Sequence, residues 1–80
     1  MYARFMPQPA PWVEQGQKAE ILDEIEVATD SLFQLSKRQI DAIRQSDFER
    51  VEHLNDQISG VLERRSALIR RFVSLTRKPN

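Results

Sequence analysis

The side chains in this sequence that could contact a charged ligand are concentrated in its C-terminal third. Arg64, Arg71 and Lys78 recur at intervals of seven residues, with further arginines beside them. A positively charged helix edge of this kind is what contact with nucleic-acid phosphates requires. The spacing therefore has two interpretations, an RNA-binding edge or a set of ion pairs with an acidic helix of the same chain. We favour the second, because the chain as a whole has a formal net charge of zero.

Residues suited to catalysis or metal binding are scarce. The chain has one histidine, His53, and no cysteine, which excludes a histidine cluster and a thiolate zinc site. Glu49 and His53 are four residues apart, whereas carboxylate-bridged di-iron bundles use the spacing Glu-x-x-His. Gly16 and Gly60 stand alone, so there is no glycine-rich phosphate loop. We expect no enzymatic activity, no cofactor and no metal, with His53 on the surface and Gly60 as a tolerated surface glycine.

Length and composition set the class of protein that must carry these residues. The chain has 80 residues, of which 40% are hydrophobic and 30% charged. An apolar content this high favours a folded chain over a disordered one. Its longest apolar runs are two or three residues, against the ~20 that span a membrane, and it lacks the apolar run of a secretory signal. We expect a cytoplasmic protein without membrane contact.

The first sixteen residues differ from the rest, because three of the four prolines lie there: Pro7, Pro9 and Pro11. Proline fixes φ and removes a backbone donor, so we predict an extended Pro-rich arm over residues 1–16. The arm also carries three aromatic residues, Tyr2, Phe5 and Trp12. They suit docking to a partner or a strap across the chain's own helices. Both interpretations stay open.

Beyond the arm, apolar residues recur at helical spacing in two stripes. The first stripe predicts a helix over residues 17–45, and the second a helix over residues 47–77 that ends near Pro79. A charged residue, Arg65, interrupts the second stripe. The residues expected at helix interfaces are Ile21, Ile25, Leu32, Phe33, Ile40, Ile43, Val51, Leu54, Ile58, Val61, Leu62, Leu68, Ile69, Phe72 and Leu75.

No glycine or proline separates the stripes, so one continuous rod competes with a hairpin. The run Ser46-Asp47-Phe48-Glu49 matches an S-x-x-E capping box, which starts a new helix with Ser46 as its cap. Residues 14–30 carry a net charge of −5 and residues 61–80 a net charge of +5. Folding back at residue 46 sets these blocks side by side, pairing residues whose numbers sum to about 92. We therefore predict an all-α antiparallel two-helix hairpin over residues 17–78.

Arg65 provides a specific prediction for this hairpin. An unpaired charge in an apolar stripe would be expensive to bury. With the pairing above, Arg65 lies near position 27, one turn from Glu24 and from Asp30. We expect its guanidinium to reach one of these acids.

A hairpin of this size cannot cover both of its stripes. Chains this short rarely build a sufficient core alone, and without cysteine there is no disulfide to compensate. We therefore expect two hairpins to pack as a homodimeric four-helix bundle.

The stretch Ala42–Leu54 and its continuation Val61–Ile69 resemble the helical-hairpin pattern of flagellar export chaperones of the FliT/FlgN type. The points of similarity are Asp47-Phe48-Glu49, which opens the second helix, and Arg65 through Ile69 further along it. The resemblance implies a small cytoplasmic helical protein that holds a secretion substrate or regulator. We therefore expect a non-enzymatic, chaperone- or adaptor-like interaction module that binds itself or a partner helix. RNA binding through the Arg64, Arg71 and Lys78 edge is the alternative.

Overall fold

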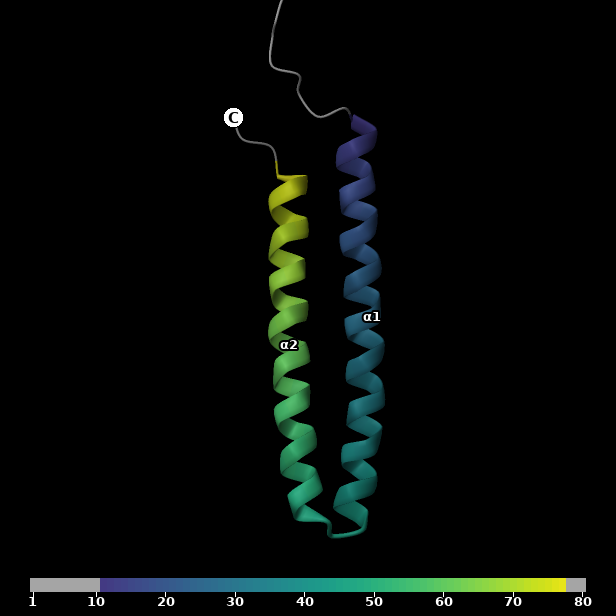
Figure 1. Ribbon diagram of the computed structural model, residues 1–80, viewed down its shortest axis with the longest axis vertical. Helices are drawn as coiled ribbons and strands as arrows, with labels where there is room; N and C mark the ends of the chain where they lie inside the picture. The colour runs from purple at the N-terminus through teal and green to yellow at the C-terminus, as the bar shows by residue number, and fades with distance from the viewer. Residues whose placement is uncertain (1–10, 78–80) are drawn as a thin grey trace, which may run out of the picture.

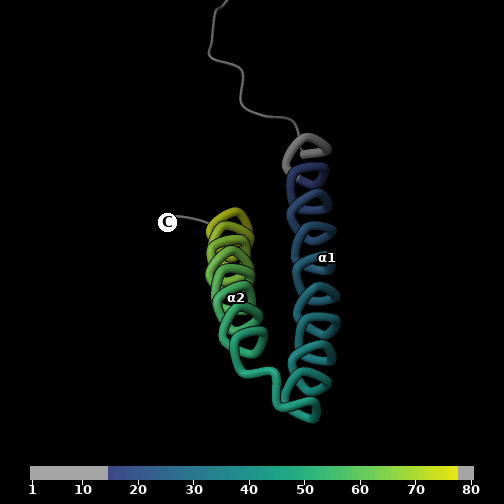
Figure 2. Tube along the Cα trace, turned by 60° about the horizontal axis from the view of Figure 1, so that its bottom comes forward, coloured from purple at the N-terminus to yellow at the C-terminus, as the bar shows by residue number. Residues whose placement is uncertain are grey.

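The computed structural model consists of two long antiparallel helices joined by a short turn (Figure 1). It describes the backbone of residues 11–77 and the side chains of residues 15–77. Helix α1 spans Pro11–Arg44 and helix α2 spans Phe48–Thr76. The two helices lie side by side from the turn onward, in both Figure 1 and Figure 2. The predicted all-α hairpin is confirmed, and the alternative prediction of one continuous helix is wrong.

Helix α1 begins earlier than the prolines predict. Residues 11–16, predicted as part of the extended arm, are helical. That part of the prediction is wrong because Pro11 occupies the first helical position, where a missing N–H costs nothing and the fixed φ already suits a helix. Trp12 is therefore part of α1, whereas Tyr2, Phe5 and the rest of the predicted arm lie outside the described residues.

The turn is closed by the backbone hydrogen bonds of a Schellman motif. The Asp47 N–H donates to the Ala42 carbonyl at 2.9 Å, and the Ser46 N–H donates to the Ile43 carbonyl at 3.0 Å. Ser46 has φ 57°, the left-handed conformation that glycine most often supplies at this position. The turn therefore uses a serine where the motif usually has glycine.

The cap of α2 differs from the predicted one. Asp47, not Ser46, is the N-cap, and its Oδ1 accepts a hydrogen bond from the Arg50 N–H at 3.3 Å. Ser46 cannot serve because its left-handed backbone already ends α1. The predicted start of α2 was therefore correct to within one residue, but its capping residue was wrong.

The core is one seam between the helices, in which side chains recur at alternating steps of four and three residues. On α1 the seam holds Ile21, Ile25, Ala28, Leu32, Leu35, Gln39 and Ala42. On α2 it holds Val51, Leu54, Ile58, Val61, Arg65, Leu68, Phe72 and Leu75. Within residues 15–77 no large side chain is fully enclosed. The seam is therefore shallow.

Near the turn the seam departs from the predicted stripe. Ile40 and Ile43, predicted to continue the stripe, are 49% and 52% exposed. Gln39 and Ala42 take the seam positions instead, because the four-three spacing after Leu35 leads to them. Gln39 Nε2 donates to the Val51 carbonyl at 3.4 Å, so the polar side chain is satisfied across the interface. Ala42 is completely buried.

Candidate interaction surface

Among the described residues, one side of the hairpin carries nearly all of the exposed large hydrophobic side chains. These residues come from both helices, and we term them the apolar side face: Leu22, Phe33, Ile40, Ile43, Phe48, Leu62, Ile69 and Val73. All but the half-buried Ile69 are among the large hydrophobic residues that are exposed, and Phe33 and Phe48 are the most exposed of them, at 65% and 66%. A concentration of large exposed apolar side chains on one side of a protein is typical of a binding surface.

Hydrogen bonds between the helices show that the two halves of this face lie on the same side. Arg65 Nε donates to Thr29 Oγ1 at 2.8 Å, and Thr29 follows Leu22 by seven residues. Gln39 Nε2 also lies 3.5 Å from Asn55 Oδ1, and Asn55 precedes Leu62 by seven residues. In an antiparallel pair, equivalent flanks of the two seams meet on one side of the hairpin. Thr29 and Asn55 therefore lie within the apolar side face.

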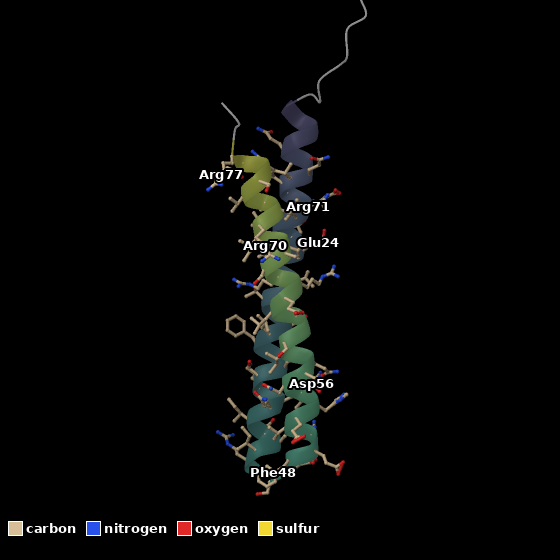
Figure 3. The ribbon with its side chains drawn as sticks, turned by 90° about the vertical axis from the view of Figure 1, so that its left-hand side faces the viewer. Glu24, Phe48, Asp56, Arg70, Arg71 and Arg77 are labelled. Atoms are coloured by element: carbon tan, nitrogen blue, oxygen red, sulfur yellow. The ribbon has the colours of Figure 1, made fainter. Side chains whose placement is uncertain are left out.

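The opposite side of the hairpin is mostly polar, with Val27 as an exposed large hydrophobic residue. There Arg64 Nη2 lies 3.1 Å from Glu24 Oε1, the ion pair that joins the helices within the described residues. Figure 3 shows Glu24 and Arg71 on this same side. An open hollow on this side is lined by polar residues such as Ser31 and Gln57, by the exposed Val27, and by apolar seam residues. Charge is thus directed away from the apolar side face.

Within the described residues, the apolar side face has few charges. Its other positions are Ala19, Glu26, Thr29, Ser36, Glu52, Asn55, Ser59, Ser66 and Thr76. Only Glu26 and Glu52 among them are ionisable. Short hydroxyl and amide side chains between the large apolar ones leave room for side chains of a second surface to pack. This pattern is typical of a helix–helix interface and not of a solvated face.

Arg65 lies in the seam as predicted, but the predicted partner is wrong. Its guanidinium bonds to Thr29 and not to Glu24 or Asp30. Arg65 leans toward the apolar side face, whereas Glu24 lies on the opposite side, where the preceding residue Arg64 reaches it. One step along a helix turns a side chain by about 100°, which decides the partner. Thr29 is a neutral partner that no charge pattern could indicate.

Part of the predicted nucleic-acid edge is engaged by the first helix. Arg64 is engaged by Glu24, Arg71 is exposed on the same side, and Lys78 lies outside the described residues. This edge runs beside the acidic block of α1. The interpretation of the arginines as partners of the first helix is therefore supported at Arg64.

The remaining candidates for chemistry are solvent-facing. His53 is exposed, and a Cβ built on Gly60 would meet nothing within 4 Å, as predicted for a surface glycine. Within the described residues, no group of three or more His, Asp or Glu side chains could hold a metal ion. Neither described helix has the length and apolar character that a bilayer crossing demands.

Several residues of the apolar side face were missed at the level of sequence. Leu22, Phe48 and Val73 are absent from the predicted interface set. The signal that could have found Phe48 is the interval of seven that joins it to Asn55, Leu62 and Ile69. Such a row beside the seam defines a second face of the same helix.

Comparison with known proteins identified no relative of this chain. No protein-family model, curated protein or solved structure matches this chain. Function is therefore argued from the surface of the hairpin.

Proposed function

We propose that this chain is a non-enzymatic protein–protein interaction module that binds helices through its apolar side face. The observation that carries the proposal is that seven of the eight large hydrophobic residues exposed in the described part of the chain lie on this one face. Burying a Phe or Leu side chain contributes about 1.5–3 kcal/mol each. Covering the face therefore provides a strong drive for association.

The shape of the face favours helices as its ligand. It is two helices wide, and its rows follow the same seven-residue spacing as the seam. Two further antiparallel helices would complete a four-helix bundle with a closed apolar centre. A homodimer supplies such a pair, and a chaperone- or adaptor-like role would use the same face to hold a helix of another protein.

Binding of RNA or DNA is less well supported. The ion pair between Arg64 and Glu24 engages one of the three residues of the basic edge, and α1 places further acids beside it. Phosphate binding through Arg64 would have to displace this ion pair. We therefore place the function on the apolar side face.

The proposal is tested with a charge placed on the face and a matched control beside it. Phe33→Glu puts a carboxylate at the middle of the face, while Gln34→Glu adds the same charge at an exposed position on the polar side. The loss of one buried phenylalanine alone weakens association at least about tenfold. Sedimentation equilibrium should show association in the wild type and in Gln34→Glu but not in Phe33→Glu.

A second readout keeps the proposal testable if the wild type does not self-associate. The dye ANS binds exposed apolar surface, so a monomeric wild type should bind it and Phe33→Glu should bind less. A monomeric wild type that binds no ANS would contradict the proposal. If the wild type self-associates, equally strong self-association of Phe33→Glu would contradict the proposal as well.

A further inference from the structure

We infer that a second copy of this chain occupies the apolar side face, with both turns at the same end and α1 of each copy against α2 of the other. The inference rests on the proposed function and specifies its partner. A two-fold axis parallel to the helices relates the copies. The contact is isologous, so the same face is used twice and the assembly closes as a dimer.

The size of the face suits such a dimer. Helix α2 has 29 residues, so the shared length of the hairpin is roughly 43 Å. Two helices packed about 10 Å apart make the face roughly 20 Å wide. The resulting area, on the order of 800 Å² per copy, is that of a standard stable interface.

The pairing of the helices shows which residues lie at the same level of the hairpin. The hydrogen bond from Arg65 to Thr29 and the ion pair of Arg64 with Glu24 join residues whose numbers sum to 94 and 88. Residues of α1 and α2 whose numbers sum to about 92 therefore lie at one level. In a dimer with both turns at one end, α1 faces these same levels of the other copy's α2.

At three levels this arrangement sets an apolar residue of α1 against an apolar residue of the other copy's α2. The pairs are Ala19 with Val73, Leu22 with Ile69, and Ile43 with Phe48, while Phe33 lies one turn from the level of Leu62. Each pair fills the space left by short side chains such as Ser36 and Ser59. The apolar residues of the two helices are thus complementary along the length of the face.

The opposite orientation matches less well. With the turns at opposite ends and Phe33 at the centre, α1 faces the other copy's α1, so Glu26 meets Ile40. Glu52 then meets Ser66, and Val73 lies level with residue 45, beyond the start of the other copy's α2. In the same-end arrangement Glu26 lies at the level of Ser66, and only Glu52 lies opposite an isoleucine, Ile40. Placing a carboxylate against an apolar side chain is unfavourable. Each arrangement has one such contact per copy, but only the same-end arrangement also covers Val73, which lies there at the level of Ala19.

Charges on the outer surface of the helices are also complementary between copies. At matching levels, α1 and α2 carry opposite charges in three pairs: Asp23 with Arg70, Lys37 with Asp56, and Arg44 with Glu49. Figure 3 shows Asp56 and Arg70 on the surface of α2 that faces away from α1, so these pairs do not form within one hairpin. In the dimer they border the shared face. One pair, Asp30 with Glu63, has like charges.

The arrangement is tested by distance measurement between spin labels. The chain has no cysteine, so Gln45→Cys in the turn gives a single labelling site. Pulsed EPR on the labelled protein should give an interspin distance of about 2–3 nm, because both turns lie at one end of a four-helix bundle. The same label in a Phe33→Glu background should give no intermolecular distance.

Three results would overturn the inference. A distance of about 4–5 nm would place the turns at opposite ends. No intermolecular distance, with a monomer that binds ANS, would overturn self-association and leave a foreign helix as the ligand of the face. No distance, with a monomer that binds no ANS, would overturn the proposed function as well.

Discussion

Replacing Ser46 with glycine should change the stability of the protein, and the direction of the change differs between a hairpin and a continuous helix. Ser46 has φ 57°, and the left-handed conformation costs an L-residue roughly 1–2 kcal/mol. Glycine adopts it without that cost but gives up about 0.5–1 kcal/mol in backbone entropy. Ser46→Gly should therefore stabilise the protein by about 0.5–1 kcal/mol. In a continuous helix the same change would destabilise by a similar amount.

The assay is thermal and urea unfolding followed by circular dichroism at a fixed protein concentration. A gain of 1 kcal/mol raises the midpoint of a domain this size by about 4–8 °C. Gln34→Gly is the matched control, because it places glycine at an exposed position inside α1, where about 0.5–1 kcal/mol should be lost. A lower midpoint for Ser46→Gly, equal to that of the control, would refute the left-handed turn.

Three further predictions test other parts of the structure. Gly60→Ala should stabilise by about 1 kcal/mol in urea unfolding, because a Cβ meets nothing there; a loss would indicate a close contact at Gly60. Arg65→Met should change stability by less than about 1 kcal/mol, since the Thr29 hydroxyl can still donate to its own helix. Arg65→Glu should destabilise the protein more in the same assay. Equal effects of the two substitutions would contradict the half-buried position of Arg65. Duplex RNA at ~0.15 M salt should bind weakly with a strong salt dependence, and submicromolar binding lost in Arg64→Ala with Arg71→Ala would favour the alternative function.

The regular spacing of apolar residues made both helices of the fold predictable. The four-three spacing from Ile21 to Leu35 and from Val51 to Leu75 identifies both helices, because only a helix brings such residues to one face. The opposite charges of the two ends correctly indicated the antiparallel pairing, although only Arg64 and Glu24 form an interhelical ion pair within the described residues. Local patterns thus carried the architecture.

The details that failed depend on geometry that residue types do not encode. Serine rarely adopts a left-handed conformation, so Ser46 gave no signal for the end of α1. Ile40 and Ile43 looked more suitable for the core than Gln39 and Ala42, but the rotation of the helix decides which residues face α2. The same rotation leaves the isoleucines on the apolar side face, which emerges only when both helices are placed together.

Concentration dependence of unfolding tests most directly whether the apolar side face is covered by association. Circular dichroism melts of the wild type and Phe33→Glu at 2 and 200 μM protein would suffice. A partner that binds only the folded state stabilises it by about 2.7 kcal/mol at a hundredfold excess over its dissociation constant. We predict a wild-type midpoint that rises by several degrees with concentration and a Phe33→Glu midpoint that does not. A wild-type midpoint that is the same at both concentrations would contradict the account.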